Sequence, residues 1–354
     1  MKYIARGNIH IHSSLSDGTS SIEEIAEDAN KAGLDFIVIT DHEHLKGKEL
    51  GLEGFYGDTL VLVGQEVNRV KNHYLVLGLD EVIQNNEENP EKIIKEVKEK
   101  GGLGIIAHPY ENGSPLVNNG RTFPWTDFEI EGFGGMEVSN YSSEWRDGAK
   151  TLLHAVYANF INDLAYINSP NPKSYAKWKE LTKNKKVTGI IGSDAHAPIF
   201  KVGPFKFKIL SYKYLFDSGN NYIYLDNPLW EFKKNKDVKN ARETLLKAIK
   251  RGHLYICYDR IEKGGGLLVY LKDNEKNIYF PGDFVPKGIY DLFAGFDDKQ
   301  KDKSSSLVIE SNEGTKIFKL PVEEKLYLQK GTYNLHISHK KRKNWIIINP
   351  FYVK

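Results

Sequence analysis

Strand-like apolar runs alternate with helix-like segments up to about residue 260, and this alternation constrains the fold more than any other feature. The runs 34–40 (LDFIVIT) and 59–67 (TLVLVGQEV) are almost continuously apolar, as strands buried on both faces are. Segment 21–32 begins at a serine cap and ends before a glycine, and segment 90–100 begins with a proline, as helices do. Strands separated by helices indicate a parallel sheet, and this many in succession favour a barrel. Further strands are expected at 8–12, 74–79, 103–107, 136–139 and 187–193, and further helices at 150–162, 174–184 and 238–251.

The character of the sequence changes after Gly264-Gly265-Gly266. Short β-rich runs follow one another, separated by turn residues such as those at 281–283 and 312–314. This pattern is typical of a small antiparallel sandwich. We therefore expect two domains, 1–260 and 265–354, in agreement with a prior of roughly 150 residues per domain.

The composition excludes several classes of protein. The formal net charge is +2, with 49 basic and 47 acidic residues, so there is no basic footprint for nucleic acid or an acidic membrane surface. A small anionic substrate stays open, because local charges would bind it. Cys257 is the only cysteine, which excludes an intrachain disulfide and a cysteine-based zinc site and fits a reducing compartment. No run of 18 apolar residues and no N-terminal apolar signal region occur, so we expect a cytoplasmic protein without membrane partners.

Ionisable residues stand at the ends of the strand-like runs, and these are His10, His12, His42, Glu66, His108, Asp194 and His196. His10 and His12 lie two apart on a strand and so face the same side. In a parallel barrel the carboxyl ends of the strands converge on one mouth, where active sites are found. Packing alone would not place unpaired ionisable groups there, because their burial costs several kcal/mol. Imidazole and carboxylate without thiolate suit Zn²⁺, Mn²⁺ or Fe²⁺.

Five motifs together resemble the PHP (polymerase and histidinol phosphatase) metallohydrolases. They are His10-Ile11-His12, Ser16-Asp17-Gly18, Thr40-Asp41-His42, Ala107-His108-Pro109 and Gly192-Ser193-Asp194-Ala195-His196. Their order and spacing match over roughly residues 3–257. The resemblance implies a TIM-like, distorted (β/α)7 barrel that binds two or three divalent metal ions.

The resemblance also implies a set of metal ligands. One metal would be bound by His10, His12, Glu66 and Asp194. A second would share Glu66 and add His73 and His108, and a third would be bound by Asp17, His42 and His196. His73 has an alternative interpretation as a loop residue, and Asp17 has one as a turn-former before Gly18.

Residues 241–255 resemble the closing helix of the carbaryl-hydrolase-like branch of this family, whose members often carry a small β domain after it. His253 stands where that branch usually has an arginine. For the β domain we rank a structural or lid role ahead of dimerisation or polymer binding. Homo-oligomer formation is left open.

The chemistry expected is metal-assisted hydrolysis by a hydroxide that bridges two cations near neutral pH. The resemblance implies a small phosphate ester or nucleotide-like substrate. Two alternatives are an esterase or amidase that uses the same metals on a carbon centre, and a non-catalytic binding protein stabilised by metal.

Three further residues are candidates for catalysis. Arg121 matches phosphate oxygens bidentately, with a solvated loop arginine as the alternative. Asp41 is a candidate for orienting a ligand histidine. His44 is either a proton donor to the leaving group or a polar neighbour, and the second interpretation is favoured.

Overall fold

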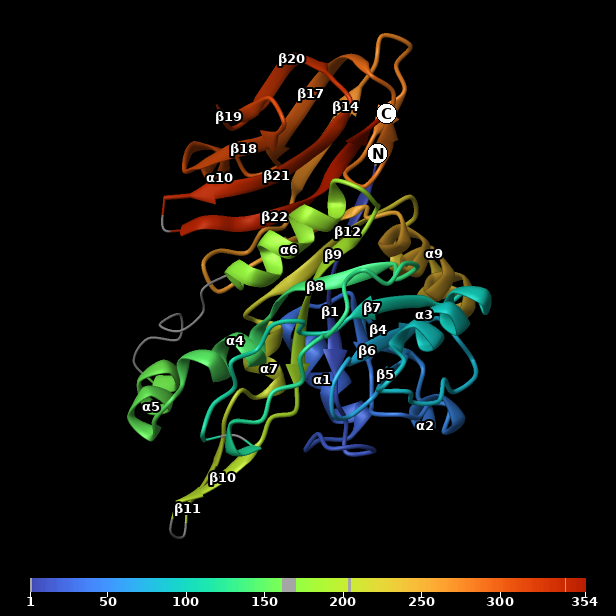
Figure 1. Cartoon of the computed structure of the whole chain (residues 1–354), viewed down its shortest axis with the longest axis vertical. Coiled ribbons are helices and arrows are strands. Elements are labelled where there is room, and N and C mark those ends of the chain that lie inside the picture. Colours follow the sequence, from blue (N-terminus) through green and yellow to red (C-terminus); the bar gives the residue numbers. More distant parts are fainter. Residues whose placement is uncertain (1, 117, 161–169, 203–204, 341) are drawn as a thin grey trace.

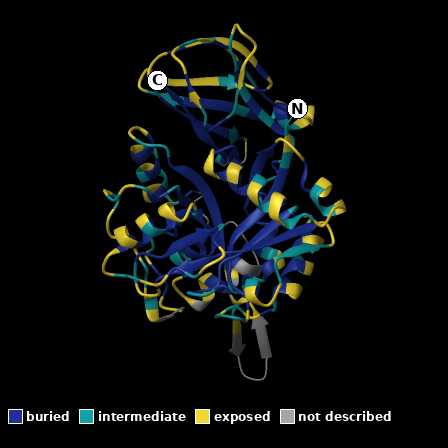
Figure 2. Ribbon diagram, turned by 90° about the vertical axis from the view of Figure 1, so that its right-hand side faces the viewer, coloured by how far each residue is buried: buried dark blue, intermediate teal, exposed yellow. Residues whose placement is uncertain are grey.

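The computed structural model describes residues 2–116, 118–160, 170–202, 205–340 and 342–354. Figure 1 shows an α/β part below and a β-rich part above, with both termini near each other in the upper part. The central strands are buried, whereas the surrounding helices keep one exposed face (Figure 2). No helix within the described ranges has the length and apolar character needed to cross a bilayer.

The α/β part is built around strands that the sequence largely predicted. They are β1 (Tyr3–Ile11), β2 (Phe36–Ile39), β3 (Gly54–Tyr56), β4 (Thr59–Val63), β5 (Gln65–Val67), β6 (Tyr74–Leu77), β7 (Leu103–Ile106), β8 (Gly135–Asn140), β9 (Thr188–Ala195), β12 (Asn220–Leu225) and β13 (Leu254–Cys257). The chain therefore has the predicted mixed α/β fold, but β12 and β13 were not predicted.

Pairing between these strands is mostly parallel around β1. β4, β2, β1, β9, β8 and β7 are parallel neighbours in that order. β6 is antiparallel to both β5 and β7, which departs from the parallel sheet expected, because the short connection between β5 and β6 leaves no room for a crossover helix. β5 follows β4 after Gly64 and pairs with β6, while its link to the stretch after β2 is an isolated parallel bridge between His42 and Glu66. The closed seven-stranded barrel therefore stays a prediction.

The helices of this part are α1 (Ile22–Ala32), α2 (Lys46–Glu49), α3 (Pro90–Glu99), α4 (Tyr141–Gly148), α5 (Leu152–Phe160), α6 (Pro172–Thr182), α7 (Tyr212–Phe216), α8 (Leu229–Lys234) and α9 (Val238–Lys250). In α1 the Ser21 side chain accepts a hydrogen bond from the Glu24 backbone N–H, and Glu24 accepts one from the Ser21 backbone N–H. Gly33 ends the helix at φ 74°. The predicted helix at 21–32 is thus confirmed with its caps.

The β-rich part contains β14 (Leu267–Lys272), β15 (Ile278–Tyr279), β16 (Phe284–Val285), β17 (Gly288–Phe296), α10 (Lys299–Lys303), β18 (Ser305–Ser311), β19 (Gly314–Lys319), β20 (Val322–Leu328), β21 (Gly331–His339) and β22 (Arg342–Val353). β15, β14, β17 and β20 form a four-stranded antiparallel sheet. β19, β18, β21 and β22 form a second antiparallel group, and the two meet where Phe296 stacks on Trp345 with ring centroids 5.4 Å apart.

The second group is not a separate sheet. β22 pairs with β13, with Tyr255 opposite Ile348, so hydrogen bonding runs from the β-rich part into the α/β part without a break. The predicted antiparallel strands are present. The division into domains at 260–265 stays a prediction.

The hairpin of β10 (Ile199–Val202) and β11 (Phe205–Lys208) follows β9 and projects from the body in Figure 1. It was not predicted from the sequence.

Candidate metal centre

A bulge near the end of β1 sets the direction of the first two histidines. His10 has φ 70°, and the pairing of β1 with both β2 and β9 shifts register between Ile9 and Ile11. A left-handed conformation costs a non-glycine residue roughly 1–2 kcal/mol, and such strain gathers at functional sites. The bulge brings Nε2 of His10 and Nε2 of His12 each to 3.1 Å from Oε2 of Glu66.

Glu66 on β5 is the centre of the cluster. Its carboxylate is buried, and each of its ion-pair partners among the described residues is a histidine. Its Oε2 also lies 3.4 Å from Nδ1 of His42, while its Oε1 lies 2.7 Å from Nδ1 of His73 and 3.3 Å from Nε2 of His108. Five imidazoles therefore converge on one carboxylate.

Two aspartates complete the other side. Asp194, at the end of β9 with φ 52°, places Oδ1 3.4 Å from Nε2 of His10 and 3.5 Å from Nε2 of His12. Asp17 places Oδ1 3.3 Å from Nε2 of His196 and Oδ2 3.5 Å from Nε2 of His42.

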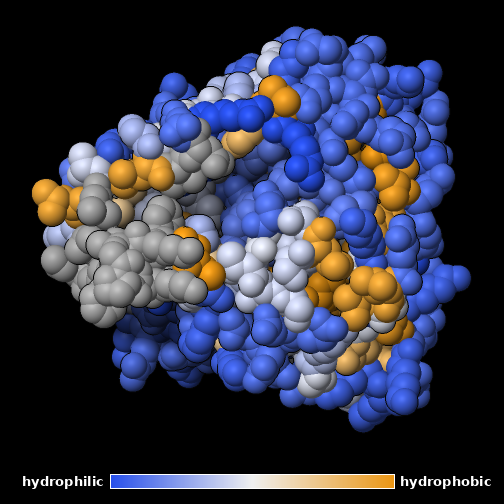
Figure 3. All heavy atoms as spheres, turned by 90° about the horizontal axis from the view of Figure 1, so that it is seen from below, coloured by the Kyte–Doolittle hydropathy of each residue, from blue (hydrophilic) through white to orange (hydrophobic). Residues whose placement is uncertain are grey.

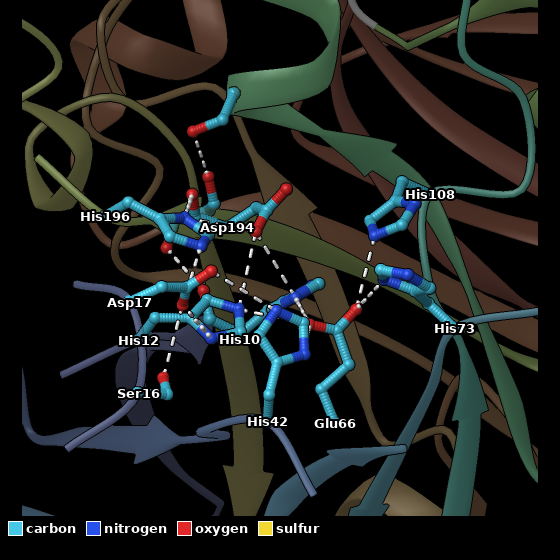
Figure 4. Close-up of polar contacts among 12 residues, drawn as sticks. His10, His12, Ser16, Asp17, His42, Glu66, His73, His108, Asp194 and His196 are labelled. Carbon is cyan, nitrogen blue, oxygen red and sulfur yellow. Dashed lines mark hydrogen bonds and ion pairs between the residues drawn. The ribbon is translucent and has the colours of Figure 1, made fainter. Parts of the chain in front are cut away.

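Figure 4 shows that the structure brings all nine predicted ligands together from five different stretches of chain. Their nitrogen and oxygen atoms form four groups in which all members lie within 4.8 Å of one another. The groups are His10–His12–Glu66, His10–His108–Asp194, Glu66–His73–His108 and His12–Asp17–His42–His196. His12 thus also joins the group that the resemblance gave to Asp17, His42 and His196.

The donor atoms present fit divalent metal ions. Several imidazole nitrogens are buried without a hydrogen-bond partner among the described residues: Nε2 of His10, Nδ1 and Nε2 of His12, Nδ1 of His42, Nε2 of His73 and Nδ1 of His108. Leaving buried polar atoms unpaired is costly, whereas a cation would use their lone pairs.

The electrostatics of the cluster agree with that fit. Burial alone would lower the pKa of His12, but Asp194 and Glu66 raise it to about 9. Burial acts in the same direction on His108, whose pKa Glu111, Glu66 and Asp194 raise to about 9. The histidines in turn hold the pKa of Glu66 well below its usual range, against the effect of burial. The carboxylates thus attract positive charge, which protons or divalent cations can supply.

The three predicted catalytic residues lie in different places. Arg121 lines the cavity over the cluster, with its guanidinium 5.2 Å from the centroid of the Phe123 ring. Asp41 is buried and accepts hydrogen bonds from Ser13 and Ser16 rather than from a ligand histidine. Nε2 of His44 lies 3.0 Å from the carbonyl oxygen of Leu15, and His44 is not among the residues that line the cavity. Their catalytic roles stay predictions.

Two buried carboxylates beside the cluster were missed. Glu137 on β8 lies 2.7 Å from Nδ1 of His10, and Glu111 lies 3.1 Å from Nδ1 of His108. Glu111 also pairs with Arg146 at 2.8 Å. The one signal in the sequence was a glutamate inside the apolar run 136–139.

The cluster opens into a cavity of about 560 Å³, a size that suits a small molecule. Its wall carries Arg69, Arg121 and Arg146 together with Phe123 and Trp145. Figure 3 shows this end of the molecule hollowed, with hydrophilic side chains around the hollow. Cations bound by the cluster would, together with guanidinium groups in the same cavity, suit an anionic ligand.

Comparison with known proteins gives a family match over part of the chain. Residues 8–108 match the model of the PHP domain. A stretch of 164 residues is 29% identical to an uncharacterized protein of Methanocaldococcus jannaschii, covering 40% of this chain and 85% of that protein.

Two solved structures are similar at low identity. A two-domain protein of Bacteroides vulgatus, described as containing a predicted PHP-like metal-dependent phosphoesterase, aligns over 99% of this chain and 95% of its own, with 12% identity and a TM-score of 0.46. A candidate metal-dependent phosphoesterase of Bifidobacterium adolescentis aligns over 58% of this chain and 92% of its own, with 15% identity and a TM-score of 0.34.

Proposed function

We propose that this protein is a metal-dependent phosphoesterase of the PHP type that acts on a small phosphate ester or nucleotide-like molecule. One observation carries the proposal: nine histidine, aspartate and glutamate side chains converge beneath a cavity whose wall holds three arginines. A structural site needs only four closed ligands, so a purely structural metal does not account for the set.

Different residues around the cavity would have different roles in the reaction. The nine side chains would hold two or three divalent ions, which supply Lewis-acid chemistry and lower the pKa of bound water. Arg121 reaches the cavity from its exposed loop and would bind phosphoryl oxygens through paired N–H groups. Phe123 and Trp145 offer apolar surface to the organic part of the substrate.

The same centre could act on a carbon ester or an amide, and this second candidate needs no change in the ligands. Arg121 favours phosphorus, because it forms no ion pair with a carboxylate among the described residues, and a neutral carboxylic ester gives its guanidinium no charge to bind. Arg146 and Arg69 already pair with Glu111 and Glu43. A non-catalytic, metal-stabilised binding protein is the third candidate.

One set of assays separates these candidates. Metal-free protein is reconstituted with Mn²⁺, Zn²⁺ or Fe²⁺ in turn and given aryl phosphates, nucleotides and aryl esters, with inorganic phosphate as competitor. The proposal expects turnover of phosphates that inorganic phosphate inhibits. Turnover of esters alone, insensitive to phosphate, would overturn it in favour of the second candidate, and no turnover at all would favour the third.

Two substitutions test the ligand assignment in the same assay. His12→Ala and Asp194→Ala should abolish turnover while the protein stays folded, because each removes an atom that contacts two other members of the cluster. His154→Ala on exposed α5 is the matched control and should keep full activity. Wild-type kcat in either variant would contradict the assignment.

Other parts of the proposal concern the closure of the barrel, the branch of the family, the compartment and the domains. We propose that strands β1 to β9 close as a distorted barrel, that the chain belongs to the carbaryl-hydrolase-like branch, and that it works in the cytoplasm as domains 1–260 and 265–354. Elemental analysis of protein purified without added metal would identify the ions.

A further inference from the structure

Glu137 reaches His10 across an intervening strand. The strand order is β8, β9, β1, so Glu137 on β8 and His10 on β1 are next-nearest neighbours, roughly 10 Å apart in the sheet. Even so, Oε1 of Glu137 lies 2.7 Å from Nδ1 of His10. The glutamate side chain must therefore pass over β9.

Gly192 makes that crossing possible. A Cβ atom built on Gly192 would lie 1.7 Å from Oε1 of Glu137 and 2.6 Å from its Cδ. The backbone of Gly192 is not left-handed, so the conformation itself does not require glycine. Glycine is needed at position 192 because a side chain there would occupy the space of the Glu137 carboxylate.

Both oxygens of the Glu137 carboxylate have hydrogen-bond partners. Glu137 is completely buried, and its Oε2 accepts hydrogen bonds from the His108 backbone N–H at 2.6 Å and from Nδ2 of Asn140 at 2.8 Å. One side chain thus contacts the ring of one candidate ligand and the backbone of another. Both of those residues, His10 and His108, have positive φ, so their backbones need support from outside.

The contact with His10 also selects a tautomer. A carboxylate accepts but does not donate hydrogen bonds, so Nδ1 of His10 carries the proton. Nε2 then has a free lone pair, and Nε2 is the atom that faces Glu66 at 3.1 Å and Asp194 at 3.4 Å. It is also the ring nitrogen of His10 that has no hydrogen-bond partner among the described residues.

We infer that Glu137 is a positioning residue of the metal centre: it crosses β9 at Gly192, fixes the tautomer of His10 and anchors the backbone of His108. This inference rests on the metal centre of the proposed function. Carboxylates that orient ligand histidines typically change metal affinity or activity by about 10- to 100-fold when they are lost.

The first test is Glu137→Gln, which keeps the size of the side chain. The NH₂ group of the new amide faces either Nδ1 of His10 or the two N–H donors from His108 and Asn140. In either case the tautomer of His10 is no longer fixed. Zn²⁺ affinity, measured against a competing chelator, should fall about 10- to 100-fold. The visible spectrum of Co²⁺-loaded protein should change, while metal-free protein should still show a cooperative unfolding transition. Glu53→Gln is the matched control, because Glu53 pairs with Arg242 away from the cavity.

The second test disturbs the contact between Glu137 and His10 by a substitution on β9. Gly192→Ala should lower Zn²⁺ affinity as Glu137→Gln does, because the new methyl group displaces the carboxylate. In a Glu137→Ala background the methyl group meets no carboxylate, so adding Gly192→Ala should change the affinity by less than about twofold. The two substitutions would then be strongly coupled. Gly54→Ala is the control, since a Cβ atom there meets no atom within 4 Å.

The outcomes separate this inference from the proposed function. Wild-type protein that binds no Zn²⁺ would refute the metal centre itself. Wild-type protein that binds Zn²⁺, together with unchanged affinity in Glu137→Gln, would refute only the role of Glu137. An equal effect of Gly192→Ala with and without Glu137 would also refute that role.

Discussion

Asp41 holds the loop after β1 through Ser13, because its carboxylate accepts hydrogen bonds from the Ser13 backbone N–H at 2.7 Å and from the Ser13 hydroxyl at 2.6 Å. The hydroxyl of Ser16 donates a third at 2.6 Å. The loop leads directly to Asp17, so the side chain of Asp41 supports one side of the candidate metal centre through this loop.

Asp41→Asn should therefore destabilise the fold. An amide offers one acceptor oxygen and turns an NH₂ group towards a donor, so at least one buried contact is lost. The free energy of unfolding in urea should fall by about 1–3 kcal/mol. Ser16→Ala removes the hydroxyl that contacts Asp41 and Asp17 but leaves both contacts of Asp41 with Ser13, so it should cost less. Equal stability of Asp41→Asn and wild type would contradict this account.

Glu66→Gln should have the largest effect on the metal centre. The substitution keeps the shape but removes the charge on which five imidazoles converge. Bound metal, measured by elemental analysis after dialysis, should drop, and turnover should fall at least about 100-fold. Full metal content in this variant would exclude Glu66 as a ligand.

Metal removal should lower thermal stability. Without cations the buried carboxylates and imidazoles must be balanced by protons alone, whereas an ion that binds only the folded state stabilises it. At a free concentration 100 times the Kd this contributes about 2.7 kcal/mol. Chelation should therefore lower Tm and Zn²⁺ or Mn²⁺ should restore it, as differential scanning fluorimetry can show. A Tm unaffected by chelator and metal would count against a bound ion.

Arg121→Ala should weaken substrate binding with the metal content unchanged. Arg121 lines the cavity but contacts no member of the metal cluster among the described residues. KM for an aryl phosphate should rise about tenfold, the equivalent of about 1.4 kcal/mol. KM for a neutral aryl ester should not change. Arg242→Ala, outside the cavity, is the control; an equal rise there would make the effect indirect.

Asp283 should contribute stability that depends on pH. Burial alone would raise the pKa of Asp283, but contacts with His253 and Arg251, each at 2.9 Å, lower it to about 2. Because the pKa is lowered on folding, the contribution is complete above the unfolded value of about 3.8 and is lost as the pH falls towards 2.

The variant Asp283→Asn tests this dependence. It should be about 1–2 kcal/mol less stable than wild type at pH 7, and the difference should shrink between pH 5 and pH 2. Urea unfolding of both proteins at several pH values measures it. A difference that stays constant over this range would show that the charge of Asp283 is not its cause.

Much of the metal centre was visible in the sequence because its members follow apolar runs. His42, Glu66 and His108 stand at the ends of apolar strand-like runs, and the carboxyl ends of neighbouring parallel strands lie close together. Even His73, for which a loop was the alternative, lies 2.7 Å from Glu66. Local patterns therefore sufficed for seven of the nine residues that converge, whereas His73 and Asp17 were added by the resemblance to the PHP metallohydrolases.

The supporting residues could not be found in this way. Glu137 acts on His10 only because Gly192 opens a path between two strands, and no local pattern encodes that relation. Asp41 lies next to His42 in sequence but points to Ser13, which spacing cannot reveal. The antiparallel strands β12 and β13 were also missed, since their partners are β1 and β22, far away in the chain.

The pairing of β22 with β13 limits how this chain can be rearranged. Asn349 on β22 donates hydrogen bonds to the carbonyl oxygens of Gly189 and Leu254 and accepts one from the Gly189 backbone N–H. Gly189 lies on the same strand as Asp194. A recombination near Gly264 that replaced the β-rich part by another domain would leave the backbone groups at the edge of β13 unpaired. It would also remove the Asn349 side chain, whose amide forms hydrogen bonds with the strand that carries Asp194. Any replacement would have to supply an edge strand and an amide in the same register.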